Sequence, residues 1–190
     1  MEIKQQYLPE KSKRRSSQKN LGIKFIVAHD TGNLNSTAKQ NVEYFIKSAN
    51  DTEASAHAFV DDLGVIECIP QNEKAWHVRK QVPEDNSIYG VDSNDYALGI
   101  ELCFFTDLER SKLAYKNYVE YIKTLCTKYN LDPSKDIVGH YKLDPSRRTD
   151  PKNAFSKIGK TWDSFLVDLN TLKDKKQEIK LEINRLVEML

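Results

Sequence analysis

Cysteine is scarce in this sequence, with three residues in 190, and no two of them have the CxxC spacing. An odd number without that spacing argues against a disulfide framework and against a zinc cluster held by thiolates. Cys68 and Cys103 lie in strand-like stretches, and Cys126 lies in a helical one. We therefore expect all three to be small residues of the core, with no reactive role.

Long apolar runs are missing as well. No run approaches the roughly 20 apolar residues of a membrane-spanning helix, so we expect no membrane insertion. The N-terminal stretch MEIKQQYLPEKSKRR has no apolar segment after its charges, which indicates a protein made in the cytoplasm without a signal peptide. The formal net charge is only +1, which gives no reason to expect nucleic acid as a partner.

The rest of the composition is typical of a folded globular chain. Hydrophobic residues make up 39% and charged residues 30%, and 190 residues suit one domain or one domain with an appendage. We predict an irregular basic lead-in over residues 1–20, a main domain over 21–170 and a helical linker or tail over 171–190. The run KSKRR is expected to be solvated, with adhesion to an anionic polymer as the alternative. Apolar residues of the tail follow heptad spacing for barely two heptads, so a linker is favoured over a coiled coil.

Apolar periodicity predicts a mixed α/β fold, in which a central mixed β-sheet is flanked by α-helices. Ser36 is the expected N-cap of the first helix. Residues 71–96 form a long polar connection, and connections of that length in compact domains are often functional. Strands are expected at 23–28, at two places within 54–70, at 97–105 and at 136–140, and helices at 36–50, 111–130 and 156–169.

Two of the four histidines end apolar strands. His29 closes FIVAH and His140 closes DIVGH, and Asp150 follows ten residues after His140. A strand end holds a side chain rigidly while the adjoining loop leaves it accessible. Two imidazoles and one carboxylate could hold zinc with a fourth position open for water. The spacing alone leaves this interpretation and that of structural histidines equally open.

Five segments carry a resemblance to a known family. IVAHDTGN, SAHAFVDDLGVIECIP, AWHV, ALGIELCF and IVGHYKLDPSRRTDP occur in this order, and the match extends from about residue 20 to about residue 168. Together they resemble the zinc-dependent N-acetylmuramoyl-L-alanine amidases, the family of T7-lysozyme-type and AmpD-type amidases, peptidoglycan recognition proteins and many phage endolysins. The resemblance makes residues 21–170 the catalytic domain. It implies that one zinc ion serves hydrolysis of the amide between N-acetylmuramic acid and L-alanine in peptidoglycan.

The resemblance also assigns the metal ligands. In the family these are the histidine that ends the first core strand, the histidine of the VGH-like segment, and a cysteine or aspartate shortly after it. Carried over, the ligands are His29, His140 and Asp150. Many endolysins have cysteine at the third position, whereas the AmpD-like branch also has aspartate. Such a donor set does not by itself distinguish zinc from another divalent metal.

The family's catalytic positions match Glu101 and Arg148. A single charge in the apolar strand ALGIELCF is costly unless it has a partner or a task, although strand alternation could turn it to solvent. Members of the T7-lysozyme type have tyrosine where this chain has Ala56, which leaves the proton transfers to Glu101 as base and then acid. Arg148 stands where lysine is common, and we expect it to polarise the scissile carbonyl unless it is only a surface arginine.

Other residues of the matching segments are expected to bind substrate. Trp76 and His77, in AWHV, resemble a segment at the cleft edge, although an aromatic residue there could simply pin the long connection. Asn33 closes the turn after His29, which clears space for substrate. His57, in SAHAFV, matches a family histidine that does not bind the metal, and we expect a structural or supporting role.

The resemblance points to a phage or prophage endolysin, or a related bacterial autolysin, that acts at the cell wall after release through a holin pore. The alternatives are a cytosolic muropeptide-recycling amidase of the AmpD type and a peptidoglycan-binding module that does not cut. A third is a structural metal whose fourth position is closed by Cys103 or His57. Residues 173–190 could lead to a wall-binding module or mediate weak self-association.

Overall fold

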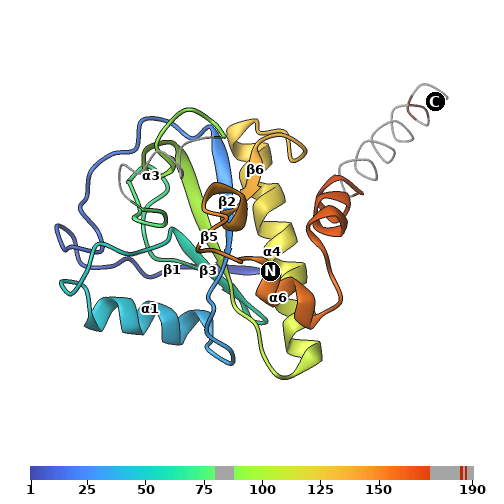
Figure 1. Cartoon of the computed structure of the whole chain (residues 1–190), viewed down its shortest axis with the longest axis horizontal. Coiled ribbons are helices and arrows are strands. Elements are labelled where there is room, and N and C mark those ends of the chain that lie inside the picture. The colour runs from blue at the N-terminus through green and yellow to red at the C-terminus, as the bar shows by residue number, and fades with distance from the viewer. Residues whose placement is uncertain (80–87, 172–184, 186, 188–190) are drawn as a thin grey trace.

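One mixed β-sheet organises the part of the chain that a computed structural model describes, residues 1–79, 88–171, 185 and 187. Six strands in this part have the order β1-β4-β3-β5-β2-β6, which confirms the predicted fold class (Figure 1). The expected tail from residue 173 lies almost wholly outside the described residues. The strands are β1 (Glu2–Gln5), β2 (Phe25–Asp30), β3 (Ala58–Asp61), β4 (Gly64–Glu67), β5 (Ala97–Leu102) and β6 (Ile137–Gly139).

Helices flank this sheet, and Figure 1 shows α1 at its lower left and α4 and α6 at its right. No helix in the described part of the chain is long and apolar enough to cross a membrane. The helices are α1 (Ala38–Lys47), α3 (Ser93–Tyr96), α4 (Leu108–Tyr129), α5 (His140–Leu143) and α6 (Lys152–Lys157), and residues 162–171 are also helical.

Parallel pairing brings the functional ends of three strands to one edge of the sheet. β2 runs parallel to both β5 and β6, and His29 of β2 is in register with Glu101 of β5. All six residues of β2 are buried, as expected for a strand covered on both faces. Because side chains alternate along a strand, His29 and Glu101 share one face with Val27 and Gly99.

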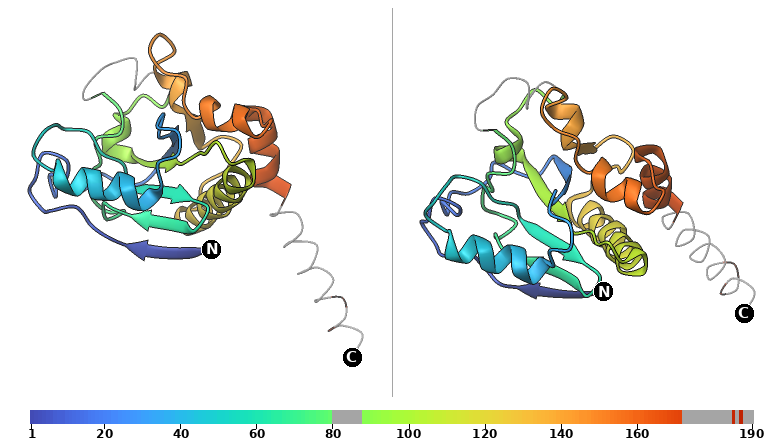
Figure 2. Two further views of the ribbon diagram at one scale, coloured as in Figure 1. Left: turned by 90° about the horizontal axis from the view of Figure 1, so that it is seen from below. Right: turned by 60° about the horizontal axis from the view of Figure 1, so that its bottom comes forward.

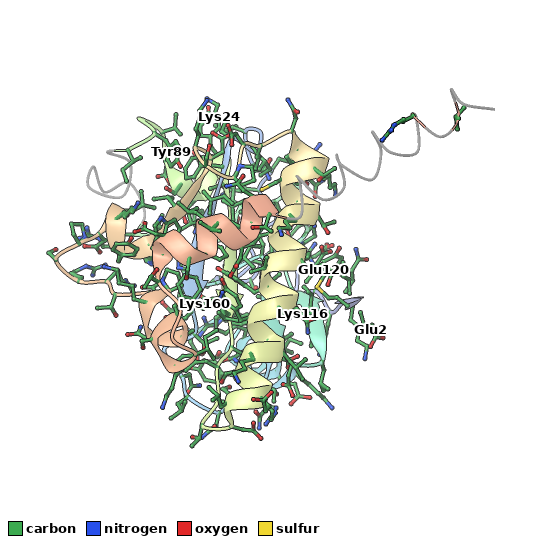
Figure 3. The ribbon with its side chains drawn as sticks, turned by 90° about the vertical axis from the view of Figure 1, so that its right-hand side faces the viewer. Glu2, Lys24, Tyr89, Lys116, Glu120 and Lys160 are labelled. Carbon is green, nitrogen blue, oxygen red and sulfur yellow. The ribbon has the colours of Figure 1, made fainter. Side chains whose placement is uncertain are left out.

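The long helix α4 closes one side of the core. Tyr118 and Ile122 are fully buried, whereas Lys116 and Glu120 point outward from the helix (Figure 3). The hydroxyl of Tyr118 donates to the backbone carbonyls of Ile100, at 3.1 Å, and His29, at 3.3 Å. This contact ties α4 to the two central strands close to where their side chains enter the site.

The N-terminal segment corrects the prediction of an irregular, solvated lead-in. Residues 2–5 form β1, which pairs in parallel with β4 at the edge of the sheet, close to the N-terminus marked in Figure 2. Arg14 and Arg15 are buried, with 3% and 6% exposure. The Arg15 guanidinium donates from Nε and Nη2 to the two carboxylate oxygens of Glu73, at 2.8 Å each. Part of the basic run is therefore buried and attaches the N-terminal segment to the rest of the domain.

Several boundaries also differ from the predicted ones. α1 is capped by Thr37, not by Ser36, because Thr37 and Gln40 form a reciprocal capping box. The expected helix 156–169 is two helical segments, separated by Gly159 with a φ of 67°. The three cysteines are buried, as predicted.

His57 holds the sheet to the long connection, in keeping with the supporting role expected for it. Its Nδ1 accepts from the backbone N–H of Gly99 at 3.0 Å, and its Nε2 lies 3.0 Å from the carbonyl oxygen of Glu73. The ring is 1% exposed. Burial lowers the pKa of His57 from 6.5 to about 4, because the charged form loses its hydration.

This shift predicts a loss of stability in mild acid. Between pH 6.5 and about 4 the unfolded chain binds a proton at His57 that the folded chain does not, so stability falls as the pH falls. The shift corresponds to about 3 kcal/mol across that window. Denaturant unfolding of the metal-free protein at several pH values should give a shallower pH dependence for His57→Asn, whose Oδ1 can still accept from Gly99. Equal slopes in both proteins would contradict the assignment.

Candidate metal centre and active site

Three predicted ligands meet at the edge of the sheet. His29 lies at the carboxyl end of β2, His140 follows β6 directly, and Asp150 lies in the loop between α5 and α6. Oδ2 of Asp150 is 2.9 Å from Nδ1 of His29 and 3.1 Å from Nδ1 of His140. One candidate ligand atom from each residue lies within 4.8 Å of the other two, and all three residues are buried.

The donor set fits a tetrahedral cation site. Zinc–nitrogen and zinc–oxygen bonds of about 2.0–2.1 Å in a tetrahedron separate neighbouring ligand atoms by about 3.3 Å. The two distances to Asp150, 2.9 and 3.1 Å, are close to that separation. Two imidazoles and one carboxylate are a common donor set of catalytic zinc, which leaves a fourth position for water or substrate.

The protonation of these groups also suits a cation. Burial lowers the pKa of His29 to about 4, so this ring is neutral at pH 7 and has a nitrogen lone pair to offer. A cation bound at this site would itself favour the ionised form of the Asp150 carboxyl.

A fourth protein ligand is absent from this cluster within the described residues. Both ring nitrogens of His57 are engaged, with Gly99 and Glu73. The Cys103 thiol accepts from the side-chain amide of Asn41 at 3.7 Å. Neither alternative ligand joins the three donors, so the arrangement supports an open site over a closed structural one.

Glu101 faces the ligands. It pairs in register with His29, lines the cavity, and its Oε2 is buried without a hydrogen-bond partner among the described residues. Glu101 is half-buried, and it lines the cavity beside the proposed ligands. Burial raises the pKa of its carboxyl well above the ordinary value, and the charges of Asp150 and Asp30 add to the rise while Arg148 opposes it. A carboxyl with a raised pKa suits proton transfer near neutral pH.

A cavity of about 470 Å³ opens over these residues. Arg148 is exposed and lines it, as does Arg147, whose Nε donates to Asp144 at 2.7 Å. Trp76 and His77 also line the cavity, although each is only 8% exposed. The lining includes Thr31 and Gly32 but not the exposed Asn33, whose contact with substrate stays a prediction.

His77 contacts the proposed metal ligand His29 directly, which its predicted substrate-binding role did not include. Its Nδ1 is 3.1 Å from Nε2 of His29, and the two rings meet edge to face with centroids 5.3 Å apart. Trp76 is fixed through its backbone, which exchanges hydrogen bonds with Ser55. The predicted cleft-edge segment is thus largely packed into the wall of the cavity.

Sequence reasoning missed two supporting residues. Asp30 follows His29 and accepts from the backbone N–H of Ala154 at 3.1 Å, which fixes the start of α6 beside the site. Asn94 accepts from the backbone N–H groups of His77 and Val78 at 3.0 and 3.1 Å. Adjacency to His29 could have indicated Asp30, whereas nothing in the sequence near Asn94 indicates its contact with a segment 16 residues earlier.

Comparisons with known proteins agree with this geometry. The family model described as N-acetylmuramoyl-L-alanine amidase matches residues 18–153. The N-acetylmuramoyl-L-alanine amidase BlyA of Bacillus subtilis is 32% identical over 145 residues, which cover 72% of this chain and 39% of that protein. The 1,6-anhydro-N-acetylmuramyl-L-alanine amidase AmpD of Enterobacter cloacae is 29% identical over 114 residues, 60% of this chain and 56% of that protein.

The chain thus spans less than half the length of BlyA, the Bacillus relative it matches. Among solved structures, the catalytic domain of XlyA superposes with a TM-score of 0.70 at 25% identity, over 89% of this chain and 99% of that domain. An AmpD structure gives a TM-score of 0.53 at 21% identity, over 83% of this chain and 93% of that one, which shows a shared fold. Since the family model covers well over half of the sequence, the chain belongs to the N-acetylmuramoyl-L-alanine amidase family.

Proposed function

We propose that this protein is a zinc-dependent hydrolase that cleaves the amide between the lactyl group of N-acetylmuramic acid and L-alanine in peptidoglycan. The observation that carries the proposal is the convergence of His29, His140 and Asp150 beside Glu101, whose Oε2 is buried without a hydrogen-bond partner among the described residues. The names of the relatives BlyA and AmpD, both amidases of this bond class, support it.

His29, His140 and Asp150 would hold the metal, through the atoms that already converge. Zinc in such a site supplies a Lewis acid and lowers the pKa of water toward neutrality. The protein's own contribution is rigidity, since His29 lies at the end of β2, His140 directly follows the parallel strand β6, and Asp150 is buried between them.

Glu101 is the proton carrier of the proposed reaction. Its carboxylate takes a proton from the attacking water, and the resulting acid passes it to the amine of L-alanine as the C–N bond breaks. Arg148 lines the same cavity, where its positive charge would polarise the scissile carbonyl and stabilise the oxyanion. Arginine can do this with a planar group that offers two N–H donors at once.

Of the predictions that follow from the proposed function, the first concerns the metal. Asp150→Asn should lower zinc affinity by at least about 100-fold, because the neutral amide is a poor ligand between two imidazoles. Zinc content after dialysis, and competition with a chromogenic chelator, measure the change. Asp163→Asn, at an exposed acid that is not part of the ligand cluster, is the matched control and should bind zinc as the wild type does. Wild-type affinity in Asp150→Asn would refute the ligand assignment.

The second prediction tests the chemistry. Glu101→Gln should keep its zinc and lose about 10²–10⁴-fold in the rate of muropeptide cleavage, since only proton transfer is removed. New L-alanine N-termini released from purified sacculi and from soluble muropeptides give the rate. Glu120→Gln, on the outward face of α4 (Figure 3), is the control. Full activity in Glu101→Gln would remove Glu101 from the mechanism, and zinc without cleavage in the wild type would favour the binding-module alternative.

The third prediction separates two neighbouring arginines. Arg148→Ala should lower kcat by about 10²-fold, and Arg148→Lys should restore part of the loss because the charge is kept. Arg147→Ala is the matched control, since its guanidinium is already paired with Asp144 and should matter less. Steady-state kinetics on a soluble muropeptide distinguishes these variants, and equal losses at both positions would argue against a specific role for Arg148.

We further propose that the bacterial cell wall is where the protein acts, as an endolysin or autolysin. The likeness to the catalytic domain of XlyA supports this setting, while AmpD keeps muropeptide recycling as the second candidate. The comparison of sacculi with soluble muropeptides in the Glu101 experiment distinguishes them, because a recycling enzyme prefers the soluble substrate. Phage origin, holin release and a wall-binding partner stay predictions.

A further inference from the structure

We propose that His77 is a positioning residue that fixes the tautomer of His29, so that the Nδ1 lone pair of His29 is directed at the metal. The inference rests on the proposed metal site but concerns residues of this chain alone. It replaces the substrate-binding role that the sequence suggested for His77.

The nitrogen of His77 that faces away from His29 contacts the backbone. This Nε2 atom lies 3.2 Å from the carbonyl oxygen of Ser93. A carbonyl oxygen can only accept a hydrogen bond, so Nε2 must carry the hydrogen. In a buried neutral imidazole the other nitrogen is then an acceptor. Nδ1 of His77 therefore has a lone pair to offer.

That lone pair faces His29. Nδ1 of His77 is 3.1 Å from Nε2 of His29, so His29 donates from Nε2 and its own Nδ1 has no hydrogen. Nδ1 is also the atom that lies 2.9 Å from Oδ2 of Asp150. Two acceptors at that distance repel each other unless a cation lies between them. The carbonyl of Ser93 thus sets the tautomer of His29 through the ring of His77, and in that tautomer Nδ1 of His29 has a lone pair for a metal.

The fold holds His77 in place from two further sides. Asn94 accepts from the backbone N–H groups of His77 and Val78, and it donates to the carbonyl of Val78 at 3.2 Å. Beneath the ring lies Gly99, where a Cβ atom would come within 2.4 Å of Cγ of His77. A glycine inside this strand is therefore required for the close approach of the imidazole.

The two histidine ligands differ in this respect. Nε2 of His140 is buried without a hydrogen-bond partner in the described part of the chain, so no such relay acts on it. His57 provides a natural comparison, because its ring centroid is 5.8 Å from that of His77 while its nitrogens bond to Gly99 and Glu73. His57 is therefore a buried neighbour of His77 whose ring nitrogens contact none of the proposed metal ligands.

Zinc affinity of His77 variants tests the inference. His77→Leu removes the acceptor and should weaken zinc binding by about 10–100-fold, the usual effect of losing a partner of a metal-ligating histidine. His77→Asn can place Oδ1 where Nδ1 now lies, and it should bind zinc nearly as the wild type does. His57→Asn is the control and should retain its affinity. Unchanged affinity in His77→Leu would overturn the proposal, as would an equal loss in His77→Leu and His77→Asn.

A second measurement needs no variant. Nitrogen-15 NMR of the imidazoles in the metal-free wild-type protein should show His29 protonated at Nε2 and His77 protonated at Nε2. His29 protonated at Nδ1 would refute the relay even if zinc binds. Failure of the wild type to bind zinc would instead count against the proposed function, because the tautomer of His29 is read without metal.

Discussion

The contact on which the site depends is the meeting of the Asp150 carboxylate with the Nδ1 atoms of His29 and His140, at 2.9 and 3.1 Å. Three electron-pair donors in a buried volume repel one another unless positive charge lies among them. Parallel pairing of β2 with β6 brings the two histidines to one edge of the sheet. The loop after α5 then places Asp150 between the two histidines.

Support for this contact extends far from the site. Arg15 bonds to the carboxylate of Glu73, whose carbonyl lies within hydrogen-bond distance of His57. His57 accepts from the backbone of Gly99, and Gly99 leaves room for the ring of His77 against His29. A segment near the N-terminus is thereby joined to the strand that carries Gly99 and Glu101. The ring nitrogens of His57 themselves contact none of the proposed metal ligands.

Much of the site could be predicted because its residues sit at positions with a strong local signal. His29 and His140 end apolar strands, and Glu101 is the one charge within another, so parallel register alone brings His29 and Glu101 side by side. The ligand set itself required the family resemblance, since spacing left structural histidines equally open. The contact of Asn33 with substrate stays a prediction, because its neighbours Thr31 and Gly32 line the cavity while Asn33 itself does not.

The rest depended on tertiary partners that local patterns do not reveal. β1 reads EIKQ, which is polar and exposed at a sheet edge, so it lacks the alternation that marks a strand. The burial of Arg15 follows from Glu73, 58 residues away. The role of His77 follows from Ser93 and Asn94, which lie beyond a long connection in the chain.

Anomalous diffraction at the zinc absorption edge, from crystals of the zinc-loaded protein, tests the central claim most directly. One strong peak is expected about 2.0–2.2 Å from Nδ1 of His29, Nδ1 of His140 and a carboxylate oxygen of Asp150. A peak bound through Nε2 of either histidine, a peak elsewhere in the molecule, or no peak at all would contradict the claim.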